Sequence, residues 1–451
     1  MSNAVVSAFK NKQLRKKLLF TTLILIVVRF GSQLPIPEID SAQISAYLKS
    51  TLGDSFSLLN SFTGGSFMQM SVFALSVTPY ITSSIIMQLM TIVIPALEEM
   101  QKDGEDGRKK INEYTRYLSI ALAVIEGAAI VIGFRNQGLF GTDNPQSSMT
   151  TAIVVAVAAL TAGAAFMMWL GEQITEKGVG NGISIILLIN IVARIPNDLS
   201  NLYQNYVAKP TDVTSKIIAA VIILAIIVAM FVFIVFLQDG ERRIPVQYAK
   251  KIQGHKVSGG QSSHIPLKVN TAGVIPVIFA SSMMSLPVVI ASFAGIQPKT
   301  GPDATFFQKF LTLCNQSDWC KIGSFAEFKY TLGLLIYIGL VIFFAYFYTS
   351  VTFNPLEISN NMKKQGGFIP GIRPGKPTTE YLTTVLNSII FLGAIGMVIV
   401  CALPIFFSGA FGADVSFSGT SLIIVVGVVI ETIKQIESLV LVRHYKGFLG
   451  N

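Results

Sequence analysis

The residues of this sequence that could carry out chemistry are few, and their spacing does not build a catalytic or metal site. None of the three histidines, His255, His264 and His444, has a partner at the spacing of metal ligands, and no nucleophile is paired with a base and an acid. Gly375-Lys376 lacks the upstream glycine and the following Ser or Thr of a phosphate-binding loop. We therefore expect no cofactor, no metal and no enzymatic activity.

Composition places the chain in a membrane. Of its 451 residues, 51% are hydrophobic and only 13% are charged, and the mean hydropathy is +0.60. Soluble domains contain about 25% charged residues, so a soluble protein with so few charges could not cover its own surface. Three cysteines are too few for a disulfide scaffold. The composition predicts an all-α polytopic membrane protein.

Ten apolar stretches are long enough to cross a bilayer, which takes about 20 residues for about 30 Å of hydrocarbon. They are residues 18–33, 70–97, 117–134, 150–170, 183–203, 217–237, 269–293, 331–351, 381–407 and 416–430. The first stretch is too long for a signal peptide core and has no small-residue cleavage pattern after it, so we expect a retained helix. The stretches divide into halves of five, 18–204 and 205–430, between an N-terminus (1–17) and a C-terminal tail (431–451).

Basic residues gather in every second connection, which predicts the orientation. Lysines and arginines are concentrated in the N-terminus, in the loops after the second, sixth and eighth stretches, and in the C-terminal tail. Basic segments stay cytoplasmic, so both termini are expected inside. The loops 238–268 and 352–380 far exceed an ordinary linker. Their charge could serve topology and lipid attraction alone, but their length favours a docking surface for an acidic or nucleic-acid partner.

Two stretches carry a matching interruption. Proline removes an amide donor and crowds the preceding turn, so Pro79 should interrupt the second stretch and Pro276 the seventh. Each stretch is the second of its half, and matching broken helices in inverted halves point to a path or binding site between them. Unrelated proline kinks are the alternative. An ion-coupled carrier stays open, although Glu126 is the only charge deep in a stretch, because Arg29 and Arg194 lie near outer ends.

Several short stretches resemble, in order along the whole chain, the SecY/Sec61-alpha family of protein-conducting channels. They lie at 78–81, 88–89, 104–110, 114–117, 178–184, 242–251, 265–270, 272–282, 353–355 and 366–377. The resemblance implies ten helices in two inverted five-helix halves around an hourglass pore in the bacterial plasma membrane. It also implies the function, which is a passive channel that passes unfolded secretory polypeptides and releases transmembrane segments sideways into lipid.

The resemblance assigns the narrowest part of the pore to a ring of aliphatic side chains. Carried over position by position, they are Val77, Ile81, Ile183, Leu187, Ile278 and Ile424. Val77 and Ile81 are four residues apart, as are Ile183 and Leu187, so each pair shares a helix face. A narrow apolar ring cannot solvate an ion and tends to dewet. Ordinary helix packing is the alternative for any of them, and Leu187 replaces the isoleucine common there.

The segment 55–70 is amphiphilic and too short and polar to span, which fits a re-entrant half-helix or an interfacial helix. By resemblance, 57–68 is the plug, a short helix that closes the channel from outside, with Phe62, Gly64 and Gly65 as the best-matched positions. The second and seventh stretches would form the lateral gate for signal peptides. The gate candidates are Pro79, Gln88, Asn270 and Pro276, with Glu126 a further candidate. Static interhelical hydrogen bonds are the alternative for Gln88 and Asn270.

The basic loops correspond by resemblance to docking sites for the motor ATPase SecA and for ribosomes. The candidates are Arg373, Arg242, Arg243, Lys250 and Lys251. Proline and glycine on both sides of Arg373 shape a turn that presents its guanidinium, whereas solvated loops are the alternative for all five.

The other expected partners are the subunits SecE and SecG, signal peptides, secretory and membrane protein substrates, and membrane lipids. Cys314 and Cys320 lie in a predicted external loop and could form a disulfide, which the sequence leaves open. Two other classes remain possible at this stage. One is an ion-coupled transporter of a small solute, and the other is an insertase without a through-pore.

Overall fold

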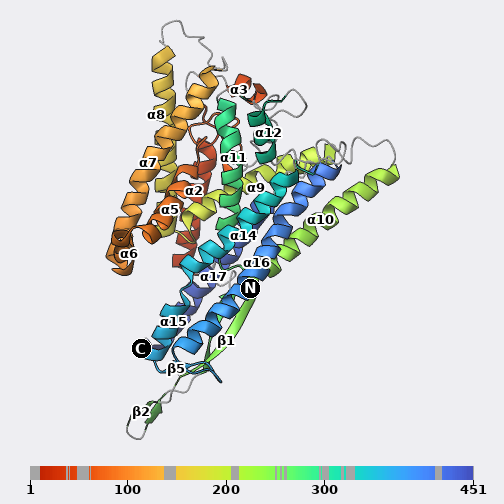
Figure 1. Cartoon of the computed structure of the whole chain (residues 1–451). Helices are drawn as coiled ribbons and strands as arrows, with labels where there is room; N and C mark the ends of the chain where they lie inside the picture. Colours follow the sequence, from red (N-terminus) through yellow and green to blue (C-terminus); the bar gives the residue numbers. More distant parts are fainter. Residues whose placement is uncertain are drawn as a thin grey trace.

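The computed structural model describes residues 11–36, 39, 41–47, 60, 62–136, 149–204, 213–248, 251–253, 256–258, 262–293, 296, 304–315, 319–320, 331–411 and 419–449. Helices dominate it and run side by side as a bundle (Figure 1). The N-terminal half contains α2 (Lys12–Gly31), α3 (Ser41–Tyr47), α5 (Thr78–Val93), α6 (Pro95–Lys102), α7 (Glu105–Asn136), α8 (Met149–Lys177) and α9 (Gly182–Leu202). The C-terminal half contains α10 (Val213–Asp239), α11 (Ile275–Phe293), α12 (Phe306–Cys314), α14 (Leu332–Thr352), α15 (Pro355–Lys364), α16 (Lys376–Phe411) and α17 (Gly419–Leu449).

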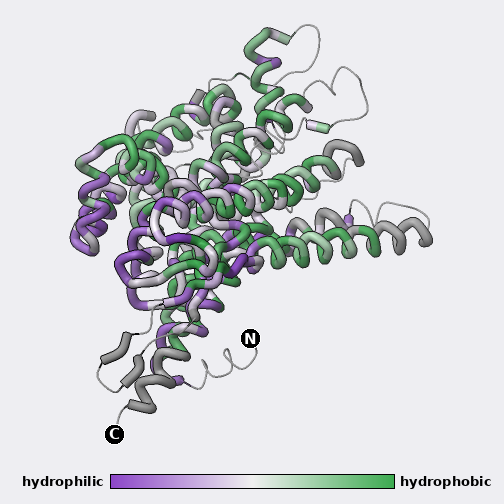
Figure 2. The backbone as a smooth tube through the Cα atoms, turned by 60° about the horizontal axis from the view of Figure 1, so that its bottom comes forward, coloured by the Kyte–Doolittle hydropathy of each residue, from purple (hydrophilic) through white to green (hydrophobic). Residues whose placement is uncertain are grey.

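Each of the ten predicted stretches coincides with a helix, because an apolar segment in lipid can satisfy its backbone only within itself. By length and apolarity, four helices of the described chain could cross a membrane, or five if the bent pair α5 and α6 counts as one span. Ten crossings therefore remain a prediction. Hydrophobic segments make up most of the helices, and hydrophilic ones gather around α6, the start of α7 and the sheet described below (Figure 2).

The two prolines begin helices and do not interrupt them, which corrects the sequence-based interpretation. Pro79 lies in the first turn of α5, whose N-terminal cap is Val77, and α11 likewise begins one residue before Pro276. Proline is tolerated at the start of a helix because the amide it lacks would have no partner there. The helix in the second stretch is also shorter than expected, since Ser71 forms a β-bridge with Pro35, residues 72–77 form turns, and the chain bends by 103° between α5 and α6.

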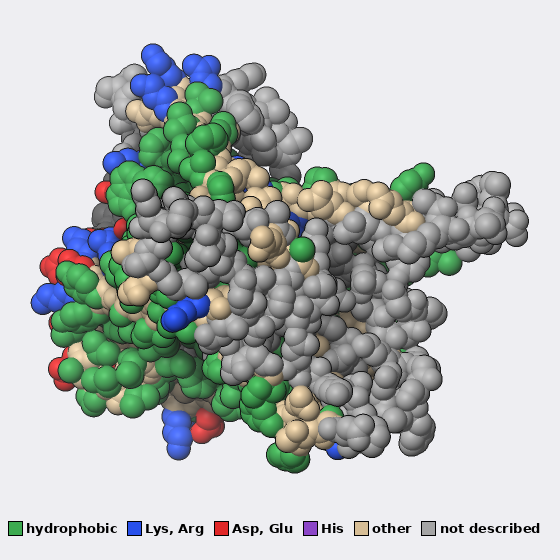
Figure 3. All heavy atoms as spheres, turned by 90° about the horizontal axis from the view of Figure 1, so that it is seen from above, with side chains coloured by type: hydrophobic (Ala, Val, Ile, Leu, Met, Phe, Trp, Pro, Cys, Tyr) green, Lys and Arg blue, Asp and Glu red, His purple; other side chains and the backbone are tan. Residues whose placement is uncertain are grey.

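Each half has its own apolar core. In the N-terminal half, Phe67, Met70 and Phe134 pack with Leu160 of α8. The C-terminal core is built mainly from α10, α11, α14, α16 and α17. The halves contact one another where α9 packs on α17 and where α7 packs on α11. Seen from above, hydrophobic side chains cover much of the described surface, and most of the Lys, Arg, Asp and Glu side chains visible there lie toward its edges (Figure 3).

The two long basic loops contain strands, so the expectation of an all-α protein is wrong at this point. Strands β4 (Ser262–Lys268), β1 (Glu241–Tyr248) and β5 (Gly367–Phe368) form an antiparallel sheet in that order, and β2 (Lys251–Gln253) pairs with β3 (Lys256–Ser258). The sheet lies at the lower end of the bundle (Figure 1). Ile244 and Val246 of β1 are buried two residues apart, as the two-residue period of a strand requires, and pack with Leu267, Met362 and Leu382.

Candidate functional site

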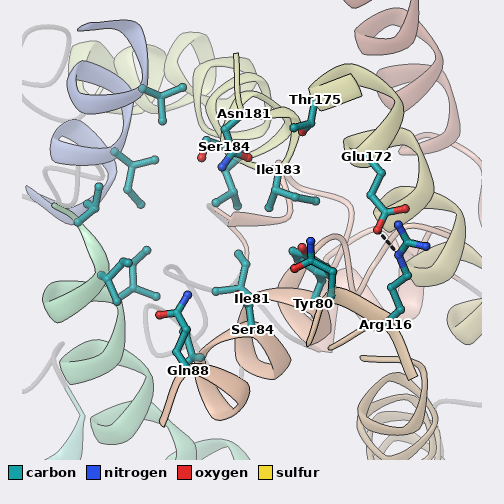
Figure 4. A pocket seen from close by; sticks show the side chains of 18 of the residues that line it. Tyr80, Ile81, Ser84, Gln88, Arg116, Glu172, Thr175, Asn181, Ile183 and Ser184 are labelled. Atoms are coloured by element: carbon teal, nitrogen blue, oxygen red, sulfur yellow. Dashed lines mark hydrogen bonds and ion pairs between the residues drawn. The ribbon is translucent and has the colours of Figure 1, made fainter. Parts of the chain in front are cut away.

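A cavity of about 640 Å³ lies between the two halves. Helices α5, α7, α8 and α9 line it from the N-terminal half, and α11 and α17 line it from the C-terminal half. Figure 4 shows Ile81 of α5 and Ile183 of α9 extending into this space, with the ribbons of the other half across it. The cavity is therefore the place where the interface between halves is not filled by side chains.

The six aliphatic residues expected to form a ring come together beside this cavity. Ile81, Ile183, Leu187, Ile278 and Ile424 line it, while Val77 is buried at the start of α5. All six belong to one apolar cluster, which draws on both halves. We call this cluster of six the waist. Its members share one location, and their role as a constriction stays a prediction.

Close contact between α8 and α9 explains how the waist residues of α9 reach the cavity. A Cβ atom on Gly171 of α8 would collide with the side chain of Ile183, and one on Gly182 would collide with the carbonyl group of Gly171. The amide of Gly182 donates to the hydroxyl of Thr175 at 2.8 Å. Asn181 caps α9 by accepting a hydrogen bond from the amide of Ser184 at 3.3 Å. These contacts fix the start of α9 and the direction of its Ile183–Leu187 face.

Val274 also lines the cavity, and the sequence analysis missed it. It packs against the same cluster as the waist. Its position repeats that of Val77, because the order of valine, proline and isoleucine in 77–81 recurs at the same spacing in 274–278. That internal repeat is the signal that could have identified it.

Polar groups border the cavity on one side. Arg116 of α7 and Glu172 of α8 form an ion pair at 2.6 Å, beside Tyr80 (Figure 4). Both charged side chains are partly exposed, so the pair adds little stability. It does place a charged wall next to an apolar one, which is suited to a wet vestibule leading to a dry waist.

The predicted gate residues do not form one polar group in the described part of the chain. Pro79 and Pro276 begin α5 and α11. Gln88 is exposed and lines the cavity (Figure 4). Asn270 does not line it and is 4% exposed, with neither amide atom bonded within the described residues. Glu126 is half-buried on α7 and does not line the cavity either.

The predicted plug lies against the waist, and where it is described Asn60 and Phe62 are helical while the residues that follow are not. Residues 57–59 and 61 fall outside the described residues, and 63–70 form successive turns. Phe62 packs against the cluster that contains the waist. Gly64 and Gly65 have φ angles of +65° and +89°, which a helix does not allow. The two glycines therefore turn the chain, and helical structure does not continue past Phe62 to residue 68 as expected.

Arg373 is exposed on a turn whose backbone is held in place. Gly371 and Gly375 adopt φ angles of +83° and +105°, and the hydroxyl of Thr378 donates to the Arg373 carbonyl at 2.8 Å. The hydroxyl of Ser359 in α15 donates to the Gly375 carbonyl at 3.0 Å. The turn is thus fixed while its guanidinium is free to meet a partner.

The remaining basic candidates lie on the sheet. Arg242 and Arg243 are exposed on β1, and Arg243 pairs with Glu241 at 2.6 Å. Lys251 begins β2, and Lys250 lies outside the described residues. Because β1 pairs with β5, the two basic loops form one folded unit, which we call the basic unit (241–268 and 355–376).

The structure settles whether Cys314 and Cys320 form a disulfide. Cys314, Cys320 and Cys401 are all free and buried. Burial raises the pKa of both the Cys314 and the Cys320 thiol. In the described part of the chain, no three His, Cys, Asp or Glu residues gather in a way that could hold a metal ion.

Comparison with known proteins decides the family. The SecY family model matches residues 71–433. The chain belongs to the SecY family. It is 43% identical to protein translocase subunit SecY of Streptomyces scabiei over the full length of both chains, and 41% identical to that of Mycobacterium tuberculosis strain H37Rv, again over the full length of both. The resemblance found in the sequence is thereby confirmed.

Solved structures show the same fold. A protein-conducting channel superposes with a TM-score of 0.60 at 17% identity, covering 93% of this chain and 91% of that one. A solved structure that concerns the plug domain of the SecY protein superposes with a TM-score of 0.57 at 18% identity. It covers 93% of this chain and 91% of that one. Membership of the SecY family makes this chain the channel subunit of a protein translocase in a membrane, and not itself an enzyme.

Proposed function

We propose that this chain is the central channel of a bacterial Sec translocon in the plasma membrane. In this proposal ten helices cross the membrane in two inverted halves, 18–204 and 205–430, with both termini in the cytoplasm. The observation that carries the proposal is the waist, in which six aliphatic residues from both halves join one cluster beside the cavity between the halves.

The chemistry of the waist fits a seal that yields to a threaded chain. Aliphatic side chains offer an ion no replacement for its hydration shell, so a narrow apolar ring dewets and blocks small ions. The same side chains form no hydrogen bonds with a passing polypeptide, so they do not retain any particular sequence. Dispersion contacts are individually weak, which allows the ring to open and close around side chains of different size.

A lateral gate between the halves fits the contacts of α11. The halves touch through α7 and α11 on one side of the cavity and through α9 and α17 on the other. We propose that the contact of α7 with α11 opens, while that of α9 with α17 acts as the hinge. Signal peptides and transmembrane segments would then move from the cavity into lipid past Gln88. Asn270, whose amide has no partner in the described chain, would supply a polar group to the same seam.

We further propose that the basic unit docks the motor ATPase SecA or a translating ribosome. A solved structure with the same fold is Sec61 in a canine ribosome–channel complex, with a TM-score of 0.59. Arg373, Arg242 and Arg243 are exposed, and they belong to one packed unit and not to two independent loops. Together with Lys250 and Lys251, they would meet RNA phosphates or acidic protein surfaces. SecE and SecG are the proposed companion subunits. They would bind against the lipid-facing helices of this chain.

Reconstituted vesicles test the proposal. The chain is incorporated together with SecE and SecG and supplied with SecA, ATP and a secretory precursor. We expect the precursor to become protected from external protease only when SecA, ATP and an intact signal peptide are all present. Protection without a signal peptide or a motor, or accumulation of a small solute down an ion gradient instead, would overturn it.

A further inference from the structure

Two side chains from outside the plug segment hold it by its backbone. Asn190 of α9 donates through Nδ2 to the carbonyl oxygen of Phe62 at 3.1 Å. Arg29 of α2 donates through Nη1 to the carbonyl oxygen of Gly64 at 3.3 Å. The two bonds approach the same short stretch from two different helices.

The Asn190 side chain is buried, its bond to Phe62 is partly buried, and the orientation of its amide is fixed. Asn190 and Ser76 are each 1% exposed, and Nδ2 also donates to the Ser76 hydroxyl at 3.0 Å. The carbonyl of Phe62 can only accept, so the amide nitrogen and not the amide oxygen must face it. Breaking the bond to Phe62 removes one partner from this buried amide, which costs free energy.

Gly64 is what allows the close approach. Its φ angle is +65°, and a Cβ atom there would lie 2.7 Å from Nη1 of Arg29 and 3.0 Å from the Cα of Asn190. A side chain at this position would displace the Arg29 guanidinium and crowd the backbone of α9 at Asn190. The sequence match of Gly64 to the plug therefore has a physical reason, which is contact with the two residues that hold it.

The same segment is tied to α2 a second time. The amide of Ile36 donates to the Met70 carbonyl at 3.0 Å, and that of Val72 donates to the Leu34 carbonyl at 2.9 Å. Residues after α2 thus pair with the chain that follows the plug. When Arg29 releases Gly64, the plug would swing on this attachment and stay with the N-terminal half.

Asn190 also links the plug to the waist, because it lies three residues after Leu187 on α9, and Ile183 is on the same helix. We propose that Arg29 and Asn190 form a clasp that holds the plug closed by its backbone. The Asn190 bond breaks when α9 moves to widen the waist. Since the clasp contacts carbonyl groups, its strength does not depend on the plug side chains. This inference rests on the proposed function of the chain as a channel.

Accessibility of a reporter cysteine tests the clasp. Ser66 is 1% exposed, so S66C in the idle channel, reconstituted with its companion subunits, should react slowly with a membrane-impermeant maleimide added from outside. Labelling is measured on the peptide that contains residue 66 by mass spectrometry, which leaves the native cysteines in place. We expect R29Q and N190L each to speed labelling by about five- to tenfold, the equilibrium change expected from one lost hydrogen bond.

Matched variants separate the clasp from a general loosening of the fold. R29K keeps a cationic donor and should restore slow labelling, which a purely structural defect would not do. G64A should act like R29Q, because its added methyl group would collide with the Arg29 Nη1 that donates to the Gly64 carbonyl. R108Q removes an exposed arginine near the start of α7, the end opposite to Phe134 and its contact with Phe67, and should change nothing.

The outcomes distinguish this inference from the proposed function. Labelling of R29Q and N190L at the wild-type rate, in channels that still transport precursor, would overturn the clasp and leave the channel function intact. Equal acceleration in R29K and R29Q would also overturn it, because only a fold defect explains that. If wild-type channels transport no precursor, the proposed function fails, and the labelling rates still decide whether the clasp exists.

Discussion

Ile81 and Ile278 each lie two residues after the proline that begins their helix, and both line the same cavity from opposite halves. Proline fixes its own φ angle and has no amide donor, so it sets where a helix starts. The position of the proline therefore fixes the direction in which the first turn of side chains points. The two halves use one local device to place one residue each at the waist.

Serine at both positions should make the closed channel leak. I81S together with I278S replaces two apolar walls by hydroxyls, which favour water in the constriction. We expect the ion conductance of reconstituted channels without precursor to rise at least severalfold. I290S changes an exposed residue of the same helix α11 and serves as the control. Unchanged conductance in the double variant would contradict a seal at the waist.

The sequence predicted where apolar helices lie, because a helix in lipid needs little more than length and apolarity. It also predicted which aliphatics meet, but only through resemblance to a family, since isoleucine is common throughout these helices. The function of Pro79 was misread because a proline can either begin a helix or break one. The choice depends on whether residues 71–77 are helical, and their turns are stabilised by contacts elsewhere in the fold.

The sheet and the clasp were missed for different reasons. Ile244 and Val246 are separated by Pro245, and a proline argues against a central strand, so the sequence of β1 favoured a loop. Strand β5 has only two residues and pairs with a segment over one hundred positions earlier, which no local pattern indicates. The clasp bonds end on carbonyl groups, which every residue has, so the residue types of Phe62 and Gly64 gave no sign of them.

Leu267 should hold the basic unit together. It is 1% exposed and packs with buried residues of β1, α15 and α16. L267A should destabilise the unit by about 2–4 kcal/mol through lost burial and a cavity. The loss of stability would be measured as faster hydrogen exchange of the β1 amides and of the Phe368 amide in β5. R243A, an exposed residue on the other face of β1, is the control, and exchange confined to β4 would show that the loops are independent.

The thiols of Cys314 and Cys320 should react slowly at neutral pH. Burial disfavours the charged thiolate and so raises the pKa of Cys314 and Cys320. Because the thiolate is the nucleophile, alkylation of both should lag behind that of an exposed cysteine near pH 8 and increase as the pH rises. Peptide mapping after iodoacetamide treatment measures this, and denatured protein supplies the reference rate. Rapid labelling of the folded protein at pH 7 would contradict the buried placement.

Reversing the charge at Arg373 should impair docking and leave the fold unchanged. R373E puts a carboxylate on a turn whose backbone bonds, from Thr378 to the Arg373 carbonyl and from Ser359 to the Gly375 carbonyl, do not involve the side chain. Helix content by circular dichroism should therefore equal that of the wild type. SecA-driven transport should fall at least tenfold, because a surface that attracted an acidic or RNA partner now repels it.

K364E makes the same charge change on exposed α15 within the same unit and should reduce transport much less. Equal losses in the two variants would mean that only net charge matters, and full activity of R373E would remove Arg373 from the docking surface.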